Sequence, residues 1–272
     1  MAHLLPLLQS LPLLNQLTFH QLTVLMSWLM IITGVAVFLI LTLTSWRAEY
    51  GRYAASYKFM IPARFAWFLQ ECPSFLVPLL LIFTGDCVIQ LNTTSGLALC
   101  LYLLHYFQRS FIYPFLIRGG KSTPAHIAAL ALMFCAFNGL LQAMGHCSKG
   151  SIQHEEGIRP LSSIFGVPLF FAGMFVNLHA DHILRSLRKP GERGYKIPRG
   201  GMFEYVSGAN YFGEILEWCG YAILARSLPA AAFAIFTICN IGPRAVHHHR
   251  YYVEKFRGEY PSGRKAIIPF IL

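Results

Sequence analysis

Long, continuous runs of apolar residues dominate this chain of 272 residues. A bilayer's hydrocarbon core takes roughly 20 apolar residues of α-helix to cross, and a backbone inside it must satisfy its own hydrogen bonds. The runs do not alternate between apolar and polar residues, which argues against a β-barrel. The sequence therefore predicts seven membrane-spanning helices, at Thr23–Ser45, Ser74–Leu91, Ser95–Leu116, Pro124–Gly145, Leu161–Leu184, Tyr205–Leu224 and Leu228–His247.

The composition agrees with this layout. Hydrophobic residues make up 55% of the chain and charged residues 12%, and the mean hydropathy is +0.49, which is too apolar for a soluble domain of this length. The spans use up most of the chain, so we expect one all-α integral membrane domain over residues 1–272. Within it, residues 1–45 form an N-terminal segment and the first span. Residues 1–22 lack a basic n-region and a cleavage site, so we interpret them as an interfacial segment rather than a signal peptide.

The cations between the predicted spans fall almost entirely on one side. Of the 22 Lys and Arg residues, 18 lie in the linkers 47–73, 117–123 and 185–204 or in the tail from 244, which share one membrane face. Because cytoplasmic loops are enriched in Lys and Arg, we expect the C-terminus to be cytoplasmic and the N-terminus non-cytoplasmic. Part of the net charge of +10 can then face anionic lipid headgroups, and the rest is available to an anionic ligand.

Neither the cysteines nor the histidines predict a metal site. The seven cysteines, at positions 72, 87, 100, 135, 147, 219 and 239, include no C-x-x-C pair, and we interpret them as small apolar residues rather than disulfides or metal ligands. The consecutive histidines 247–249 would point about 100° apart on a helix, so they cannot converge on one ion. His179 and His182 lack a third ligand at a suitable spacing.

Ionisable residues inside a span are functional candidates, because each costs several kcal/mol unless it is paired or faces water. The end of the fifth span is the densest case, with four polar residues on one helix face: Asn177, Asp181, Arg185 and Arg188. Asp181 and Arg185 could simply pair as a helix-end salt bridge. The supply of cations continues as far as Arg199, however, which points instead to phosphate binding.

Two further polar stripes lie on the sixth and seventh predicted helices. Glu214 and Glu217 share a face with Asn210 on the sixth. Two carboxyl groups this close in lipid either share a proton in a structural role or accept hydrogen bonds from a polar ligand or from the Arg-rich segments, and we favour the second interpretation. On the last helix the stripe recurs every four residues, as Arg244, His248 and Tyr252.

A fourth polar group joins the second and third spans. Gln70 and Glu71 precede the second span, and Pro73 suits the first turn of its helix. On the third span, Tyr106 lies near the middle of the bilayer, where a tyrosine of an interfacial belt would not be. A buried tyrosine hydroxyl needs a hydrogen-bond partner, and we expect Glu71 to be that partner. Tyr106 shares its helix face with Tyr102, Arg109 and Tyr113.

Together these groups predict a cavity open to the cytoplasm, with a cationic rim, polar side chains in its middle and a Glu/Tyr pair deeper among apolar residues. The sequence contains no G-x-G-x-x-G, Walker A, G-x-S-x-G or H-E-x-x-H motif, so a nucleotide would bind between helices rather than on a Rossmann unit. Such a cavity suits an anionic dinucleotide that enters from the cytoplasm and meets a lipid-soluble substrate from the bilayer.

The steroid 5α-reductases are the family that these segments resemble, on the motifs "PARFAWFLQECPSF", "HYFQRSFIYPFLIRGGK", "NLHADHILRSLRKPGERGYKIPRGGMFEYVSGANYFGEILEWCGYA", "HHHRYYVEKF" and "RKAIIPFIL". The resemblance runs from about Tyr50 to the C-terminus. It implies a seven-helix bundle that binds NADPH and reduces the carbon 4–5 double bond of a 3-oxo-Δ4 steroid, with hydride delivered to carbon 5. Residues 46–272 would then be the catalytic and NADPH-binding part.

The resemblance also implies residue roles. Glu71 and Tyr106 would hydrogen-bond the steroid's 3-oxo group and stabilise the enolate that forms, with Tyr106 as proton donor and Gln70 supporting Glu71. A carboxyl group in an apolar pocket can stay protonated near neutral pH and donate. Steroid contacts are implied for Trp67, Phe134 and Phe236. NADPH contacts are implied for Asn177, Asp181, Arg188, Tyr195, Asn210, Glu214, His248, Tyr252 and Arg264, with Tyr50 and Arg244 as further candidates.

Two departures from the family pattern stand out. The tail "FRGEYPSGRK" is one residue longer before the terminal Arg-Lys, and Asn240 stands where an aromatic residue is expected. They concern the place of Arg264 and the shape of the steroid pocket.

Other assignments are left open by the sequence. A related membrane reductase acting on a sterol ring or an enoyl lipid would use the same cofactor pocket, whereas a membrane methyltransferase would bind S-adenosylmethionine. A non-enzymatic lipid or ion transporter is the alternative from another class. We expect a substrate from the bilayer and no nucleic acid, and we leave the oligomeric state and the preferred steroid open. The host membrane would be the endoplasmic reticulum in a eukaryote or the inner membrane in a bacterium.

Overall fold

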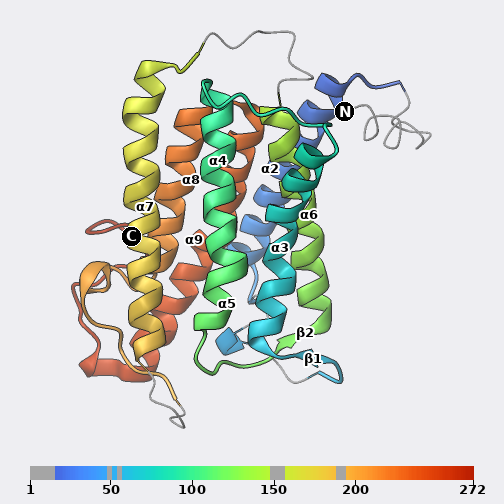
Figure 1. Cartoon of the computed structure of the whole chain (residues 1–272). Helices are drawn as coiled ribbons and strands as arrows, with labels where there is room; N and C mark the ends of the chain where they lie inside the picture. Colours follow the sequence, from blue (N-terminus) through green and yellow to red (C-terminus); the bar gives the residue numbers. More distant parts are fainter. Residues whose placement is uncertain (1–15, 48–50, 54–56, 148–156, 188–193) are drawn as a thin grey trace.

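The computed structural model describes residues 16–47, 51–53, 57–147, 157–187 and 194–272, which form one bundle of long helices (Figure 1). The helices are α2 (Phe19–Leu43), α3 (Ala63–Phe83), α4 (Thr94–Phe107), α5 (Tyr113–Leu116), α6 (Ala125–His146), α7 (Pro160–Ser186), α8 (Ala209–Ala225) and α9 (Leu228–Phe256). A π-helical turn, Gln108–Ile112, joins α4 to α5. Strands β1 (Met60–Ile61) and β2 (Thr123–Pro124) pair antiparallel at one end of the bundle.

Five of the described helices, α2, α3, α6, α7 and α9, are long and apolar enough to cross a membrane. The helix α8 has 17 residues and α4 has 14. The π-helical turn and α5 follow α4 directly and extend this helical segment to Leu116. Apolar side chains cover the outside, as at Ile32 of α2, which is 62% exposed, and Phe175 of α7, which is 69% exposed. The predicted all-α membrane fold is therefore found, while seven crossings and the sides of the termini stay predictions.

Side-chain caps fix the starts of three helices. Thr18 and Gln21 form a capping box, so α2 begins at Phe19, before the predicted Thr23. The Thr93 hydroxyl accepts a hydrogen bond from the Gly96 amide ahead of α4, and Ser227 does the same for Ala230 ahead of α9.

The second helix begins earlier than predicted. The helix α3 starts at Ala63 rather than Ser74, so Gln70 and Glu71 lie within it and Pro73 lies in its interior instead of its first turn. An interior proline removes one backbone hydrogen bond, and membrane helices tolerate this where neighbouring groups satisfy the freed carbonyl. Here the Leu69 carbonyl accepts a contact from the Cys72 thiol at 3.7 Å. The prediction missed the first half of α3 because its polar residues interrupt the apolar run that was used to find the span.

The boundaries of the last two helices also differ from the prediction. The helix α9 continues to Phe256 rather than His247, so the whole Arg244, His248 and Tyr252 stripe is helical. The helix α8 begins at Ala209 rather than Tyr205, because the chain before it is held by the C-terminal tail. The Ser207 and Gly208 amides donate to the carbonyls of Lys265 and Ala266, at 2.8 and 2.9 Å.

The helices α7 and α8 pack backbone against backbone through glycines. A Cβ atom at Gly173 of α7 would lie 2.6 Å from the Cα of Glu217 of α8, and one at Gly166 would lie 2.6 Å from the Leu224 amide nitrogen. Small residues allow such an approach in membrane bundles. The close packing brings the polar end of α7 directly against the polar face of α8.

Cys87 and Cys147 form a disulfide, with Cα atoms 5.0 Å apart, which corrects the interpretation of all seven cysteines as buried thiols. Cys87 follows the end of α3 and Cys147 is the C-cap residue of α6, so both lie at helix ends rather than within a helix. The other five cysteines are free, and all of them lie within helices, as expected.

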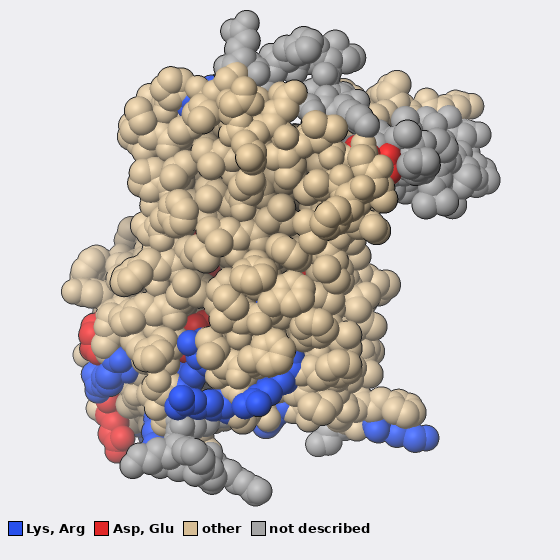
Figure 2. Space-filling model, in the orientation of Figure 1, with Lys and Arg blue, Asp and Glu red and all other residues tan. Residues whose placement is uncertain are grey.

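Charged side chains gather at one end of the bundle. Figure 2 shows Lys and Arg clustered around the end that carries β1 and β2, while the middle of this face is almost free of charge. The disulfide joins helix ends at the opposite end, because α3 and α6 both leave the strand end and run away from it.

Candidate active site

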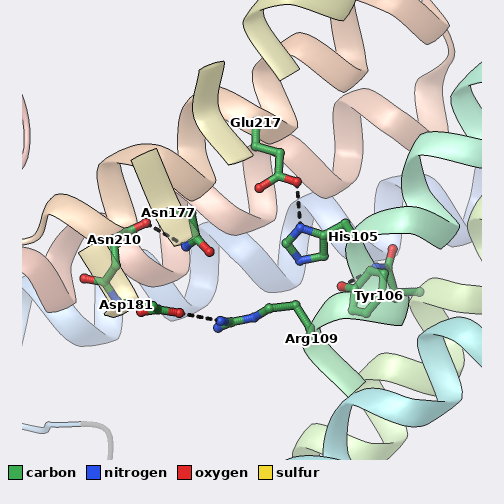
Figure 3. A network of polar contacts seen from close by, with 8 residues as sticks. His105, Tyr106, Arg109, Asn177, Asp181, Asn210 and Glu217 are labelled. Atoms are coloured by element: carbon green, nitrogen blue, oxygen red, sulfur yellow. Dashed lines mark hydrogen bonds and ion pairs between the residues drawn. The ribbon is translucent and has the colours of Figure 1, made fainter. Parts of the chain in front are cut away.

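Buried polar side chains meet inside the bundle, where α4, α7 and α8 face one another (Figure 3). Arg109, on the π-helical turn, donates to Asp181 of α7 at 2.7 Å, and their side chains are only 8% and 3% exposed. The guanidinium also lies over the rings of Trp67 and Tyr113, 5.0 and 4.4 Å from their centroids. Single π-helical turns often mark functional sites. Asp181 thus bonds to Arg109, and not to Arg185 as the alternative interpretation held.

A second buried pair joins α4 to α8. The His105 Nδ1 and the Glu217 carboxylate are 2.7 Å apart, with side chains 4% and 0% exposed. The second oxygen of Glu217 has no hydrogen-bond partner among the described residues. Of the two carboxyl groups of α8, that of Glu217 bonds to His105, and that of Glu214 lies within electrostatic reach of Arg109 and of Glu217.

Asn177 and Asn210 complete the contact between α7 and α8. The Asn177 amide donates to the Asn210 carbonyl oxygen at 3.0 Å, and Asn177 is 2% exposed. Figure 3 shows these two residues and Asp181 on the side of α7 and α8 that faces Arg109.

Glu71 and Tyr106 both reach the same stretch of α6. The Cys135 thiol lies 3.9 Å from a carboxyl oxygen of Glu71, and the Asn138 amide donates to the Tyr106 hydroxyl at 3.4 Å. Cys135 and Asn138 are one helical turn apart. These contacts stand in place of the direct Glu71–Tyr106 hydrogen bond that we expected, although the two groups remain within electrostatic reach of each other.

The residues implied to contact steroid fall into two groups. Phe134 of α6 and Phe236 of α9 stack, with ring centroids 4.3 Å apart and planes 18° from parallel. Trp67 and Gln70 lie on α3, with the Trp67 ring beside Tyr113 at 5.1 Å and Gln70 buried next to Glu71.

On α9, the cofactor candidates are already in contact with neighbours. Arg244 donates to the Asn240 side chain at 3.1 Å, so Asn240 holds the arginine from one turn away. The His248 ring lies between the rings of Tyr53 and Tyr211, at 5.7 and 5.4 Å.

Tyr252 and Arg264 meet where the C-terminal tail folds back. The Tyr252 ring stacks on Tyr260 at 5.6 Å, and the Arg264 guanidinium lies 5.2 Å from the centre of the same Tyr260 ring. Arg264 is 2% exposed, donates to the Pro198 carbonyl at 3.0 Å and lies 3.5 Å from Glu204. In this arrangement Arg264 ties the tail to the turn that precedes α8.

Tyr195 lies against the C-terminal end of α9, with its ring 5.5 Å from Tyr251 and 5.1 Å from the Lys255 ammonium. Two more cofactor candidates, Tyr50 and Arg188, lie outside the described residues.

Two buried N–H donors near Arg109 have no hydrogen-bond partner among the described residues: Trp67 Nε1 and Arg185 Nη1. The Arg185 guanidinium lies 5.5 Å from the Tyr113 ring, on which Arg109 also lies. Unsatisfied buried donors are costly, so this part of the site suits a ligand rich in acceptor oxygens. No group of three or more metal-ligating side chains occurs among the described residues.

Arg109, His105 and Asn138 were not predicted from the sequence to have a role in the site. Arg109 and His105 carried a usable signal, because each is an ionisable residue within an apolar span. Asn138 carried a weaker one, as a lone amide within the fourth predicted span.

Comparison with known proteins agrees with the resemblance. The family model described as 3-oxo-5-alpha-steroid 4-dehydrogenase matches residues 121–272. The chain is 48% identical to 3-oxo-5-alpha-steroid 4-dehydrogenase 1 of Macaca fascicularis, over 82% of this chain and 84% of the relative. It is 47% identical to the Bos taurus protein of the same name, over 88% and 93%. It is also 48% identical to 3-oxo-5-alpha-steroid 4-dehydrogenase 2 of Sus scrofa, over 82% and 87%.

Identity at this level, over most of the length of both chains, extends well beyond the short motifs on which the resemblance was first seen. The chain belongs to the 3-oxo-5-alpha-steroid 4-dehydrogenase family of oxidoreductases, the steroid 5α-reductases.

Proposed function

We propose that this protein is a seven-span membrane reductase that uses NADPH to reduce the carbon 4–5 double bond of 3-oxo-Δ4 steroids. One observation carries the proposal. The chain, 48% identical to a relative named 3-oxo-5-alpha-steroid 4-dehydrogenase 1, holds a buried polar network inside a bundle with an apolar exterior. Ionisable side chains buried in an apolar bundle cost desolvation energy, so such a network is a candidate functional site.

The residues around Arg109 fit a long anionic cofactor. Trp67 Nε1 and Arg185 Nη1 have no hydrogen-bond partner among the described residues, the Arg109 and Arg185 guanidinium groups both lie over the Tyr113 ring, and cations gather at this end of the bundle. We assign the cofactor to the α7, α8 and α9 faces, with contacts from Asn177, Asp181, Tyr195, Asn210, Glu214, Arg244, His248, Tyr252 and Arg264, and from Tyr50 and Arg188. A 2′-phosphate needs cations, which favours NADPH over NADH.

The reaction needs donors at the substrate's 3-oxo oxygen. Bound NADPH supplies a hydride to carbon 5, which leaves negative charge on that oxygen. Glu71, in its carboxylic acid form, and Tyr106 reach the same turn of α6 from two different helices, so both can donate to one carbonyl. The Tyr106 proton then goes to the enolate, which becomes the saturated ketone. The stacked Phe134 and Phe236 rings offer a flat apolar surface for the steroid.

Two independent features support the proposed orientation. The Lys and Arg residues gather at the strand end of the bundle, which supports a cytoplasmic location for that end. A disulfide, such as the one at the opposite end, persists in an oxidising compartment. Both features support the proposal that NADPH enters from the cytoplasm and that the C-terminus lies there.

Turnover with purified protein tests the proposal. NADPH should be oxidised on addition of a 3-oxo-Δ4 steroid, with a product two mass units heavier, and NADH should serve poorly. Sterols with ring double bonds, enoyl lipids and S-adenosylmethionine are the comparison ligands. Turnover only with an enoyl lipid or a sterol would favour the related reductase, and no oxidation with any of them would overturn the proposal.

A further inference from the structure

We infer that Asn138 is a positioning residue for proton transfer, which leaves the Tyr106 hydroxyl proton free for the steroid. We further infer that the backbone carbonyl of Pro229 determines which way the Asn138 amide faces. This inference rests on the proposed function, in which Tyr106 is the proton donor.

A continuous chain of hydrogen bonds connects the two. The Asn138 amide nitrogen lies 3.1 Å from the Tyr102 hydroxyl and 3.4 Å from that of Tyr106. The Gln142 amide nitrogen lies 3.1 Å from the Asn138 carbonyl oxygen and 3.1 Å from the Pro229 carbonyl oxygen. These residues come from three helices, α4, α6 and α9, and Asn138 and Gln142 are fully buried.

The chain continues beyond Gln142 to the end of α6. The Tyr221 hydroxyl donates to the Gln142 side-chain oxygen at 2.9 Å. Since that uses the only hydroxyl proton of Tyr221, the His146 Nε2, 2.8 Å away, must be the donor to the Tyr221 oxygen.

Chemical polarity fixes each orientation in turn. Amide oxygen and nitrogen are interchangeable in shape, so an isolated Asn or Gln could face either way. The Pro229 carbonyl, however, can only accept, so Gln142 must turn its NH₂ group toward it. The same NH₂ group also faces Asn138, which must therefore present its oxygen there. The NH₂ group of Asn138 is left to face the two tyrosines.

The consequence falls on Tyr106. A tyrosine hydroxyl has one proton and two acceptor positions. Asn138 donates to the Tyr106 oxygen, so the Tyr106 proton cannot be given back to Asn138 and is directed to another acceptor, for which a steroid carbonyl would compete with the Ser74 side chain. After the proton leaves for the steroid, the same Asn138 N–H stabilises the tyrosinate oxygen. The tyrosinate regains a proton from water when the site opens.

A different amide orientation would reverse this effect. If Asn138 turned its oxygen toward the tyrosines, Tyr106 would donate to that oxygen and lose its place as donor to the steroid. Gln142 contacts neither Tyr106 nor the proposed steroid surface, yet it controls this choice.

Three variants test the inference. Asn138→Leu removes both N–H donors at similar volume, Asn138→Asp keeps the shape but replaces the NH₂ group by an acceptor, and Gln142→Met frees the Asn138 amide to turn. Ser27→Ala is the matched control, because Ser27 is fully buried and its hydroxyl donates only within α2, to the Thr23 carbonyl. The measurements are kcat and KM, the solvent deuterium isotope effect on kcat, and the affinity for a 3-oxo steroid in the presence of NADP⁺.

The expected result separates the kinetic constants. Asn138→Leu and Asn138→Asp should lower kcat about 10²-fold and Gln142→Met about tenfold, with a much smaller change in KM. The solvent isotope effect should rise, because proton transfer becomes limiting. In a Tyr106→Phe background, Asn138→Leu should weaken steroid binding less than about twofold, since the hydroxyl it positions is gone.

Near-normal kcat in folded Asn138→Leu would overturn the inference. So would parallel losses of thermal stability, KM and kcat in the Asn138 and Gln142 variants with an unchanged isotope effect, because that pattern describes mere bracing. If the unmutated chain binds the steroid but does not reduce it, the proposed function is wrong. Separately, if the losses of steroid affinity caused by Asn138→Leu and Tyr106→Phe are additive in the double variant, the positioning role of Asn138 is wrong.

Discussion

Arg109 is the residue on which the polar contacts of the site converge. It bonds to Asp181, lies over two aromatic rings and is within electrostatic reach of both Glu71 and Glu214. The guanidinium can be buried away from water because these protein groups compensate its charge. Removing one partner of such a buried pair leaves the other charge uncompensated, so Asp181 and Arg109 depend on each other for stability.

Glu71 and Tyr106 are the residues on which the chemical step should depend most. Tyr106→Phe removes the hydroxyl and keeps the ring, and Glu71→Gln keeps a donor but loses the acid. Each should lower kcat by about 10²–10³-fold, because Tyr106→Phe removes one preorganised donor to the developing enolate and Glu71→Gln replaces an acidic O–H donor by an amide N–H. NADPH binding, followed by quenching of tryptophan fluorescence, should stay nearly unchanged. Loss of cofactor binding and thermal stability in parallel with activity would indicate that the pair only braces α3 and α4.

Single residues were predictable from the sequence where their chemistry conflicts with lipid. Asn177, Asp181, Glu214 and Glu217 could be selected because ionisable or amide groups are costly within spans. Their partners could not be predicted, because Arg109 and Asp181 are 72 positions apart and His105 and Glu217 are 112 positions apart. Only the packing of three helices determines those pairs.

Among the elements, α7 and α8 do most to shape the site. Their glycines let the backbones touch, and this places Glu217 where it meets His105. Apolar runs predicted most of the long helices, since hydrophobicity sets the length that lipid can hold. They failed for the first half of α3, where the polar residues Arg64, Gln70 and Glu71 interrupt the apolar pattern.

Gly173→Ala tests the packing of α7 on α8. The added Cβ would collide with the Glu217 backbone, so the helices must separate, at a cost of about 1–3 kcal/mol. Thermal unfolding in detergent should occur at a lower temperature, and kcat should fall as the His105–Glu217 pair is displaced. Gly242→Ala is the control, because a Cβ there meets nothing within 4 Å and alanine favours a helix. Equal stability of the two variants would contradict the backbone contact.

At the scale of the whole molecule, charge and redox chemistry support our proposal that the two ends of the bundle face different compartments. The strand end is rich in Lys and Arg, and the other end carries the Cys87–Cys147 disulfide. The charge bias could be predicted from the sequence, because it depends only on how many Lys and Arg residues each linker between the spans contains. The disulfide was not, because its cysteines are 60 positions apart and no spacing rule joins them.

Labelling in sealed microsomes tests this orientation. An impermeant maleimide should modify Lys196→Cys at once, because Lys196 is exposed at the cationic end. Leu91→Cys, 71% exposed near the disulfide end, should react only after the membrane is permeabilised. The unmutated chain gives the background from native cysteines. The reverse pattern of accessibility would mean that the cationic end faces away from the cytoplasm, which would contradict the proposed entry of NADPH from the cytoplasm.

The most direct test of the proposed chemistry is the fate of a labelled hydrogen. NADPH carrying deuterium at the reactive carbon of its nicotinamide is incubated with the protein and a 3-oxo-Δ4 steroid, and the product is examined by NMR. The proposed mechanism predicts deuterium at carbon 5 and a solvent-derived hydrogen at carbon 4, because Tyr106 exchanges its proton with water between turnovers. Deuterium at carbon 4, or a reduced steroid without deuterium, would contradict it.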